Sequence, residues 1–152
     1  MKIALSLSAQ AQVYYHGSDT LSDPTTYDFS KPNANRGTNV AGMYLTPREY
    51  EAKSFGKHVH RFTINTSKPF LNRRSKISPA MQRKFVSVML DETRYKKDWI
   101  LEHLLPEFIE TSKLPDISGL GKRDIILSGG FDSFLDGDHI AVFNPKQDVN
   151  PL

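Results

Sequence analysis

Cysteine is absent from this chain of 152 residues. Its absence excludes disulfide bonds, thiolate nucleophiles and cysteine-based zinc sites within the chain. Long apolar runs are missing as well, and no stretch approaches the roughly 18 apolar residues that a membrane-spanning helix needs. Polar side chains also interrupt residues 1–12 too often for the apolar core of a signal peptide. We therefore expect a cytoplasmic protein that does not enter a membrane.

The balance of residue types is that of a folded domain. Hydrophobic residues make up 38% of the chain and charged residues 24%, whereas a disordered chain has fewer hydrophobic residues and a larger net charge. The length suits one hydrophobic core and is too short for two. We expect a single domain over residues 1–152, with 1–12 and 146–152 poorly ordered at its ends.

Positive charge gathers in one part of the sequence. The net charge is +3, and six basic residues with no acidic one fall between positions 68 and 84, namely Lys68, Arg73, Arg74, Lys76, Arg83 and Lys84. Such a patch suits an anionic partner: nucleic acid, an acidic protein or the phosphates of a nucleotide. The alternative interpretation is a solvated loop followed by an exposed helix face.

Residues 13–18 have the sequence Val-Tyr-Tyr-His-Gly-Ser. The β-branched and aromatic residues predict a strand, and the glycine predicts the turn that ends it. This strand would deliver His16 to the turn. Gly17 has no Cβ, so its backbone could approach a flat ligand more closely than that of any other residue.

A second short strand is predicted over residues 42–46, which have the sequence Gly-Met-Tyr-Leu-Thr. A helix over 47–55 is predicted to follow it, with Thr46 as the N-cap and Glu49 closing a capping box. Tyr44 lies before this helix and Phe55 at its end, so the two rings could face each other across a slot for a planar group. Core packing is the alternative for such an aromatic pair.

The middle of the chain predicts one strand and three helices. Alternation of polar and apolar residues indicates a strand over 58–65, and apolar residues three and four positions apart indicate helices over 78–90, 96–112 and 117–127. In the 96–112 helix we assign the apolar stripe that contains Trp99 to the core, and we expect Pro106 to bend the helix.

Two histidines of the predicted strand, His58 and His60, would lie on the same face of the sheet. This spacing is compatible with a metal ion. No carboxylate or cysteine accompanies the pair in the sequence, however, and protein zinc sites use three or four ligands. We expect no metal site.

Residues 131–135 and 139–143 predict a β-hairpin. The sequence that joins them, Asp136-Gly137-Asp138, carries the Asp-Gly pair typical of tight turns. The second strand has apolar residues on both faces, which favours a central position in its sheet. A polar residue at the start of such a strand would be held rigidly, as a catalytic group requires.

In their order and spacing these segments resemble the ADP-ribosyltransferase superfamily, specifically the branch with the poly(ADP-ribose) polymerases and small phage-encoded ADP-ribosyltransferase domains. The matching positions are His16-Gly17-Ser18, residues 42–46, Phe55, residues 130–132 and residues 139–145. Residues 79–127 match no part of the family pattern. The resemblance implies an α+β fold, with a split antiparallel β-sheet core and several flanking helices. It also implies NAD as the substrate, without a metal.

The resemblance implies a role for each matching residue. His16 would hydrogen-bond the ribose hydroxyls of NAD, and the backbone of Gly17 would hold the nicotinamide amide. Ser18 would support the adenosine side, while the rings of Tyr44 and Phe55 would sandwich the nicotinamide. Such a site must fix the leaving group and stabilise the positive charge that develops on the sugar.

The chain departs from the family pattern at two positions. The family has a glutamate at the start of the last strand, where this chain has His139 preceded by Asp138. We favour Asp138 as the electrostatic and base group, turned inward by a one-residue bulge, with His139 assisting. Ala52 replaces a serine that contacts the nicotinamide amide in several relatives, and Ser54 is the candidate substitute.

A further candidate is an arginine in the polar segment between the first two predicted strands. Arg36 lies among asparagine and glycine residues, in a loop from which it could reach a phosphate of the bound nucleotide. The alternative is an ordinary surface arginine. Long polar loops of this kind are often functional.

The function that the resemblance implies is NAD-dependent mono-ADP-ribosylation of a macromolecule, either protein or nucleic acid. It is typical of a phage or toxin-type effector, which would act in the cytoplasm, that of a host included. The alternative is a binding module of the same fold that lacks the glutamate. It would be weakened or inactive as a catalyst and would grip a protein or nucleic acid through the basic segment 68–84.

Overall fold

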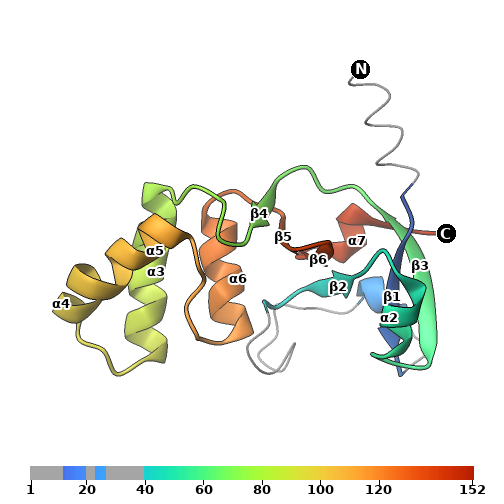
Figure 1. Ribbon diagram of the computed structural model, residues 1–152, viewed down its shortest axis with the longest axis horizontal. Helices are drawn as coiled ribbons and strands as arrows, with labels where there is room; N and C mark the ends of the chain where they lie inside the picture. The colour runs from blue at the N-terminus through green and yellow to red at the C-terminus, as the bar shows by residue number, and fades with distance from the viewer. Residues whose placement is uncertain (1–11, 20–22, 27–39) are drawn as a thin grey trace, which may run out of the picture.

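The computed structural model describes residues 12–19, 23–26 and 40–152, and the fold is mixed α+β (Figure 1). The strands are β1 (Tyr14–Ser18), β2 (Met43–Leu45), β3 (His58–Ile64), β4 (Pro69–Leu71), β5 (Ser133–Asp136), β6 (His139–Val142) and β7 (Val149–Pro151). The helices are η1 (Pro24–Thr26), α2 (Glu49–Lys53), α3 (Pro79–Glu92), α4 (Lys97–Trp99), η2 (Ile100–Leu104), α5 (Leu105–Thr111), α6 (Gly119–Ser128) and α7 (Pro145–Asp148).

The strands form two sheets. One has the order β1-β3-β7 and is antiparallel throughout. The other has the order β2-β6-β5-β4, in which β4 and β5 run parallel. The prediction of an α+β fold is confirmed, but the expectation of purely antiparallel pairing is wrong at this edge. A bridge between Tyr15 and Thr46 joins the two sheets where β1 and β2 meet.

Strand alternation divides the apolar side chains between two cores. The core between the two sheets contains Met43, Leu45, Phe62, Ile140, Val142 and Val149. The core between the four-stranded sheet and the helices contains Phe70, Phe134 and Ala141 from the strands, with Phe85 of α3 stacked on Phe108 of α5 at 4.5 Å. The prediction that β6 is central and buried on both faces is confirmed, since its last three residues are all buried.

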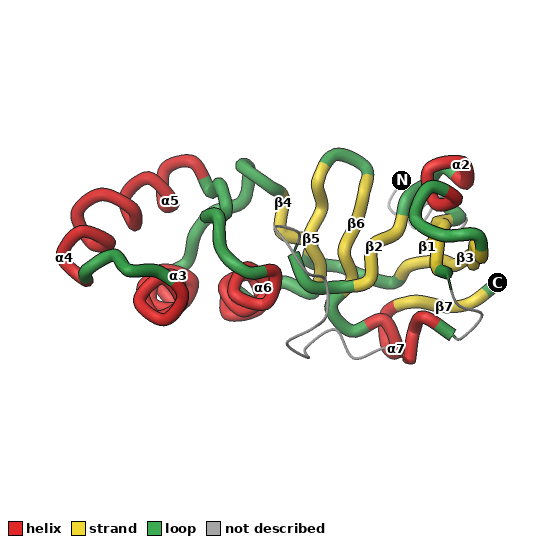
Figure 2. Tube along the Cα trace, turned by 90° about the horizontal axis from the view of Figure 1, so that it is seen from below, coloured by secondary structure: helices red, strands yellow, loops and turns green. Residues whose placement is uncertain are grey.

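Helices α3 to α6 lie beyond the β4 edge of the four-stranded sheet, as Figure 2 shows. The predicted start of α3 is confirmed, whereas α6 begins at Gly119, two residues after its predicted start. Ser78 caps α3 by accepting a hydrogen bond from the backbone N–H of Met81 at 3.3 Å, and Ser118 caps α6 in the same way from Gly121 at 2.9 Å. Serine side chains satisfy N–H groups that the first helical turn leaves without partners.

The helix predicted over 96–112 forms as α4, a π-helical turn (η2) and α5 in succession. The π turn lies directly before Pro106, which cannot donate a backbone hydrogen bond. Assigning the whole apolar stripe to the core is wrong at Trp99, whose exposed fraction is 49%. Its ring packs instead on His103 at 3.9 Å between ring centroids, and Ile100 and Phe108 supply the buried contacts.

Two local expectations near the ends of elements are corrected. Thr46 does not cap α2: the N-cap is Arg48, without a side-chain cap, because the backbone of Thr46 pairs with β1.

The C-terminal residues 146–152 are ordered as α7 and β7, with Val149 buried against β3. Residues 1–11 lie outside the described part of the chain. Within that part no helix has the length and apolar character needed to cross a membrane.

Candidate functional site

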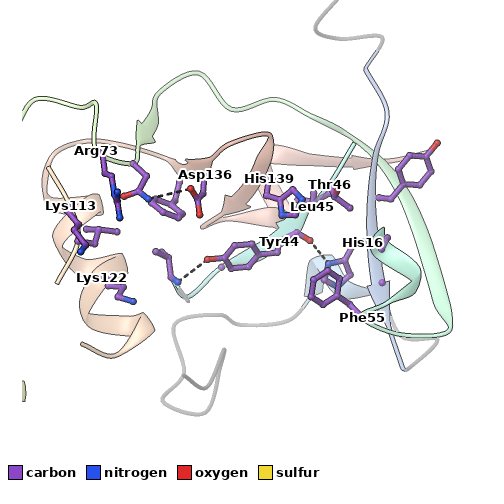
Figure 3. Close-up of a pocket in the computed structure, with 18 residues that line it drawn as sticks. His16, Tyr44, Leu45, Thr46, Phe55, Arg73, Lys113, Lys122, Asp136 and His139 are labelled. Carbon is purple, nitrogen blue, oxygen red and sulfur yellow. Dashed lines mark hydrogen bonds between the residues drawn. The ribbon is translucent and has the colours of Figure 1, made fainter. Parts of the chain in front are cut away.

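A cleft of about 560 Å³ opens over one face of the four-stranded sheet (Figure 3). It runs from β1 and the end of α2, across β2, β6 and β5, to the loops after β4 and α5 and to helix α6. Its lining residues are Tyr15, His16, Gly17, Val40, Gly42, Tyr44, Leu45, Thr46, Ala52, Phe55, Asn72, Arg73, Lys113, Leu114, Lys122, Phe134, Asp136 and His139.

The register of the β5–β6 hairpin determines which polar side chains reach this cleft. Asp136 and His139 are directly opposite each other across the hairpin, so their side chains lie on the same face of the sheet. Asp138 precedes His139 by one residue and lies in the turn. Strand alternation therefore brings His139 to the cleft, whereas Asp138 is not among the described residues that line it.

His16 is a neutral hydrogen-bond acceptor at one end of the cleft. Its Nδ1 lies 2.7 Å from the carbonyl oxygen of Tyr44. A carbonyl oxygen only accepts, so Nδ1 carries the hydrogen and Nε2 keeps a lone pair. Burial lowers the pKa of His16 from its ordinary value, the bond to Tyr44 opposes this shift, and the neighbouring His60 adds to it.

Lowering the pH should destabilise the fold through His16. Because the folded pKa is lowered, the unfolded chain takes up the proton first. The stabilisation from neutral His16 is therefore complete above about pH 6.5 and is lost as the pH falls through the folded pKa. We expect the difference in unfolding free energy between wild type and His16→Gln, from urea titrations, to shrink with decreasing pH. A constant difference between about pH 8 and about pH 5 would contradict a neutral imidazole.

Tyr44 forms the middle of the cleft wall. Burial, with a smaller contribution from Asp136, raises the pKa of its phenol to about 12. The phenol oxygen accepts a hydrogen bond from the backbone N–H of Val40 at 3.0 Å. Phe55 lines the same cleft but is 68% exposed, so its ring lies at the rim. Both predicted aromatic residues therefore reach the cleft, at different depths.

Gly17 is needed for the close approach of β1 to α2. A Cβ at this position would lie 1.8 Å from the carbonyl oxygen of Ala52, an overlap that only a shift of the helix could relieve. The glycine thus brings the strand that carries His16 against the helix that ends near Phe55. The requirement for glycine therefore comes from the backbone of α2 and not from a ligand.

Replacing Gly17 with alanine should destabilise the protein by about 1–3 kcal/mol, the usual cost of overpacking. Gly42→Ala is the matched control, because it also lines the cleft but its nearest heavy atom would lie at 3.1 Å. We expect thermal denaturation to show a lower Tm for Gly17→Ala than for Gly42→Ala. Equal Tm values for the two variants would mean that the contact between β1 and α2 is not tight.

His139 is held by a glutamate that the sequence analysis did not consider. Its Nε2 lies 2.6 Å from Oε2 of Glu51 in α2. A carboxylate accepts, so Nε2 carries the hydrogen, and Nδ1 keeps a lone pair whenever the ring is neutral. Glu51 is also in an ion pair with Arg48, one turn earlier. The i,i+3 spacing of Arg48 and Glu51 was the available signal, but nothing in the sequence links either residue to His139.

Asp138 is engaged mainly by Arg48, although its Oδ1 also lies 3.8 Å from Nε2 of His139. Both of its carboxylate oxygens accept hydrogen bonds from the guanidinium of Arg48, and this pairing lowers the pKa of the carboxyl group. Its side chain is exposed, on the outer side of the turn. The geometry therefore corrects the preference for Asp138, because the inward-turning bulge that this preference requires is absent from the hairpin register.

The remaining candidates lie away from the cleft lining or outside the description. The hydroxyl of Ser54 is exposed and donates to the carbonyl of Glu51 at 2.6 Å, so it does not replace the serine expected at Ala52. Ser18 belongs to β1 but does not line the cleft. Arg36 lies outside the described residues. No group of three or more metal ligands gathers within the described ranges, where His58 and His60 both lie on β3.

The far end of the cleft holds polar residues that the sequence analysis did not assign to a site. Arg73 and Lys113 come from two loops, Lys122 from α6, and Asp136 from the hairpin. Strand alternation from His139 across the short turn could have identified Asp136. The three cations come from segments that only the fold brings together.

Comparison with known proteins gives no match: no protein-family model, no curated protein and no solved structure is similar to the chain.

Proposed function

We propose that this protein is an NAD-dependent mono-ADP-ribosyltransferase that modifies a macromolecule. The observation that carries the proposal is the convergence of His16, Tyr44, Phe55 and His139 on one cleft. These side chains come from four separate segments, and each was predicted from the sequence to contact the same ligand. The proposal includes the ADP-ribosyltransferase-like form of the α+β fold and an effector role, of phage or toxin type, in the cytoplasm.

The residues of the cleft fit a dinucleotide. Its volume of about 560 Å³ lies within the roughly 300–1,000 Å³ of small-molecule sites. Neutral His16 offers an acceptor for a ribose hydroxyl, Gly17 lines the cleft beside it, and Tyr44 forms the adjoining middle of the wall. When bound, NAD would supply a ribose–nicotinamide bond whose cleavage releases nicotinamide and makes ADP-ribose available for transfer.

His139 is the group we assign to the acceptor. With Nε2–H donated to Glu51, the Nδ1 lone pair of the neutral ring would accept the proton of the attacking hydroxyl, amine or base. Glu51 would stabilise the resulting imidazolium, as a carboxylate does for a catalytic histidine.

The experiment that tests this function is incubation of the protein with labelled NAD and cell lysate, followed by mass spectrometry of the labelled species. We expect an ADP-ribose adduct on a protein or nucleic acid, together with release of nicotinamide. The purified protein alone should hydrolyse NAD slowly, with water as the acceptor.

The contrary outcome is equally specific. If no label is transferred, no nicotinamide is released and NAD does not change the Tm, the enzymatic proposal fails. The fold would then serve as a binding module, and the basic segment 68–84 would be its contact surface.

A further inference from the structure

The cleft extends beyond the residues used by the proposed chemistry. In Figure 3, His16 and Phe55 lie at one end, His139 lies between, and Arg73, Lys113 and Lys122 lie together at the other. These three cations come from the loop after β4, the segment after α5, and helix α6. Among the described lining residues, Asp136 is the one carboxylate that faces them. This end therefore carries a net positive charge.

Lys122 is a charged group buried within this end of the cleft. Its exposed fraction is 7%, and burial lowers its pKa, whereas Asp116 and Glu92 act in the opposite direction. Glu92 is at the same time held by the backbone N–H and the hydroxyl of Ser118, at 2.8 Å each. An anion bound at this end of the cleft would gain a charge-assisted contact with the buried ammonium group.

The backbone at Arg73 has an uncommon left-handed conformation. Arg73 and Ser112 have positive φ angles of 65° and 48°, and they are the two such non-glycine residues in the described chain. They contact each other, since the N–H of Arg73 donates to the carbonyl of Ser112 at 3.4 Å. Left-handed backbone costs on the order of 1 kcal/mol per residue, and it persists where the surrounding structure enforces it. Arg73 and the adjacent Lys113 are thereby directed to one place.

Asp136 and Asn72 add the groups that a sugar needs. The amide of Asn72 donates to Oδ1 of Asp136 at 3.4 Å, and both residues line the cleft beside the cations. A carboxylate is a natural acceptor for ribose hydroxyls, and a cluster of lysine and arginine binds phosphate. The ligand that matches both features is a phosphorylated ribose.

We propose that Arg73, Lys113, Lys122 and Asp136 form a subsite for a nucleoside phosphate. The subsite is separated from the nicotinamide end by His139. Binding of a nucleoside phosphate there does not require catalysis, although its place in the reaction rests on the proposed function. Two sources have this chemistry: the phosphate-bearing half of the dinucleotide itself, or a nucleotide of a nucleic-acid acceptor that presents its nucleophile to His139.

The test is equilibrium binding of ADP, measured by calorimetry at low and high salt. We expect binding that weakens with salt, and a loss of affinity of about tenfold or more in Lys122→Met, the scale of one charge-assisted contact. Lys146→Met, on α7 and outside the cleft lining, is the charge-matched control and should bind ADP like the wild type.

Folding of the variants is checked in the same samples. Removing one member of a buried charge interaction is destabilising, and Asp116 and Glu92 lie near Lys122, so we expect Lys122→Met to lower the Tm and its binding is compared at a temperature where it is folded. Arg73→Ala and Lys113→Met change exposed side chains and should each weaken ADP binding without unfolding the protein. If ADP does not bind, or if all three variants bind it like the wild type, the subsite does not exist.

Competition then identifies the source. Displacement of ADP by NAD and by ADP-ribose, but not by a short single-stranded oligonucleotide, assigns the subsite to the dinucleotide; the reverse pattern assigns it to a nucleic-acid acceptor. ADP binding that depends on Lys122 in a protein without transferase activity would sustain the subsite and defeat the proposed function. Transferase activity without ADP binding would support the proposed function and rule out the subsite.

Discussion

His139→Ala is expected to lower kcat for ADP-ribose transfer by about 10²- to 10⁴-fold, the usual contribution of a general base. The imidazole lies on the cleft at the start of a strand that is buried along the rest of its length. Nothing else at that position of the described cleft carries a titratable group except Asp136, across the hairpin. The measurement is the initial rate of nicotinamide release and label transfer, with NAD binding followed separately by calorimetry.

Two control variants test whether the loss of activity is specific to His139. Asp138→Asn should change the rate by less than about threefold, since its carboxylate is paired with Arg48 outside the cleft and contributes little there. His103→Ala removes an exposed imidazole from η2, outside the cleft lining, and should have no effect. If Asp138→Asn abolishes transfer while His139→Ala does not, Asp138 is the residue that acts in the cleft and the assignment of His139 is wrong.

Glu51→Gln is expected to have the second largest effect, a fall in kcat of at least about tenfold. Replacing the orienting carboxylate of a catalytic histidine by its amide is costly, up to about 10⁴-fold in a serine protease triad, because the amide can select the wrong tautomer. Glu51 acts through His139 and is therefore a positioning residue. Its loss should lower kcat with little change in KM, since the carboxylate is outside the cleft lining.

Rescue by a shorter carboxylate separates positioning from a structural role. Glu51→Asp keeps the acceptor for Nε2 of His139 and should restore part of the kcat that Glu51→Gln loses. Glu49→Gln is the matched control on the same helix, where Glu49 pairs with Lys53 at 3.9 Å in the solvent. A kcat in Glu51→Asp no higher than in Glu51→Gln would show that the contact with His139 is not used.

The β5–β6 hairpin shows which features the sequence predicts and which it does not. The Asp-Gly turn and the apolar run after it predict both strands and the central place of β6, and the structure confirms them. The same alternation, applied one residue further, would have favoured His139 over Asp138 and identified Asp136. The preference for Asp138 followed from its charge, and the register of the hairpin overrules it.

Local signals also failed where tertiary contacts were stronger. Thr46 has the side chain of an N-cap, but its backbone is used by β1, so α2 begins later. Trp99 has helical spacing with buried residues, yet it lies at the exposed edge of the stripe. Val149, in a tail with little apolar content, is buried because β3 offers it an unpaired edge. In each case one partner distant in the sequence decided the outcome.

By itself, the sequence determined the longer elements, their order and the residues that one strand or one turn delivers, because periodicity and turn chemistry act over a few residues. It did not predict the short elements β4, α7 and β7. His16, Tyr44 and His139 belong to this part. Only the tertiary structure decided that Glu51 meets His139, and that cations from three segments meet at the far end of the cleft. Such contacts depend on how whole elements pack, and no short-range pattern in the chain encodes which distant charges become neighbours.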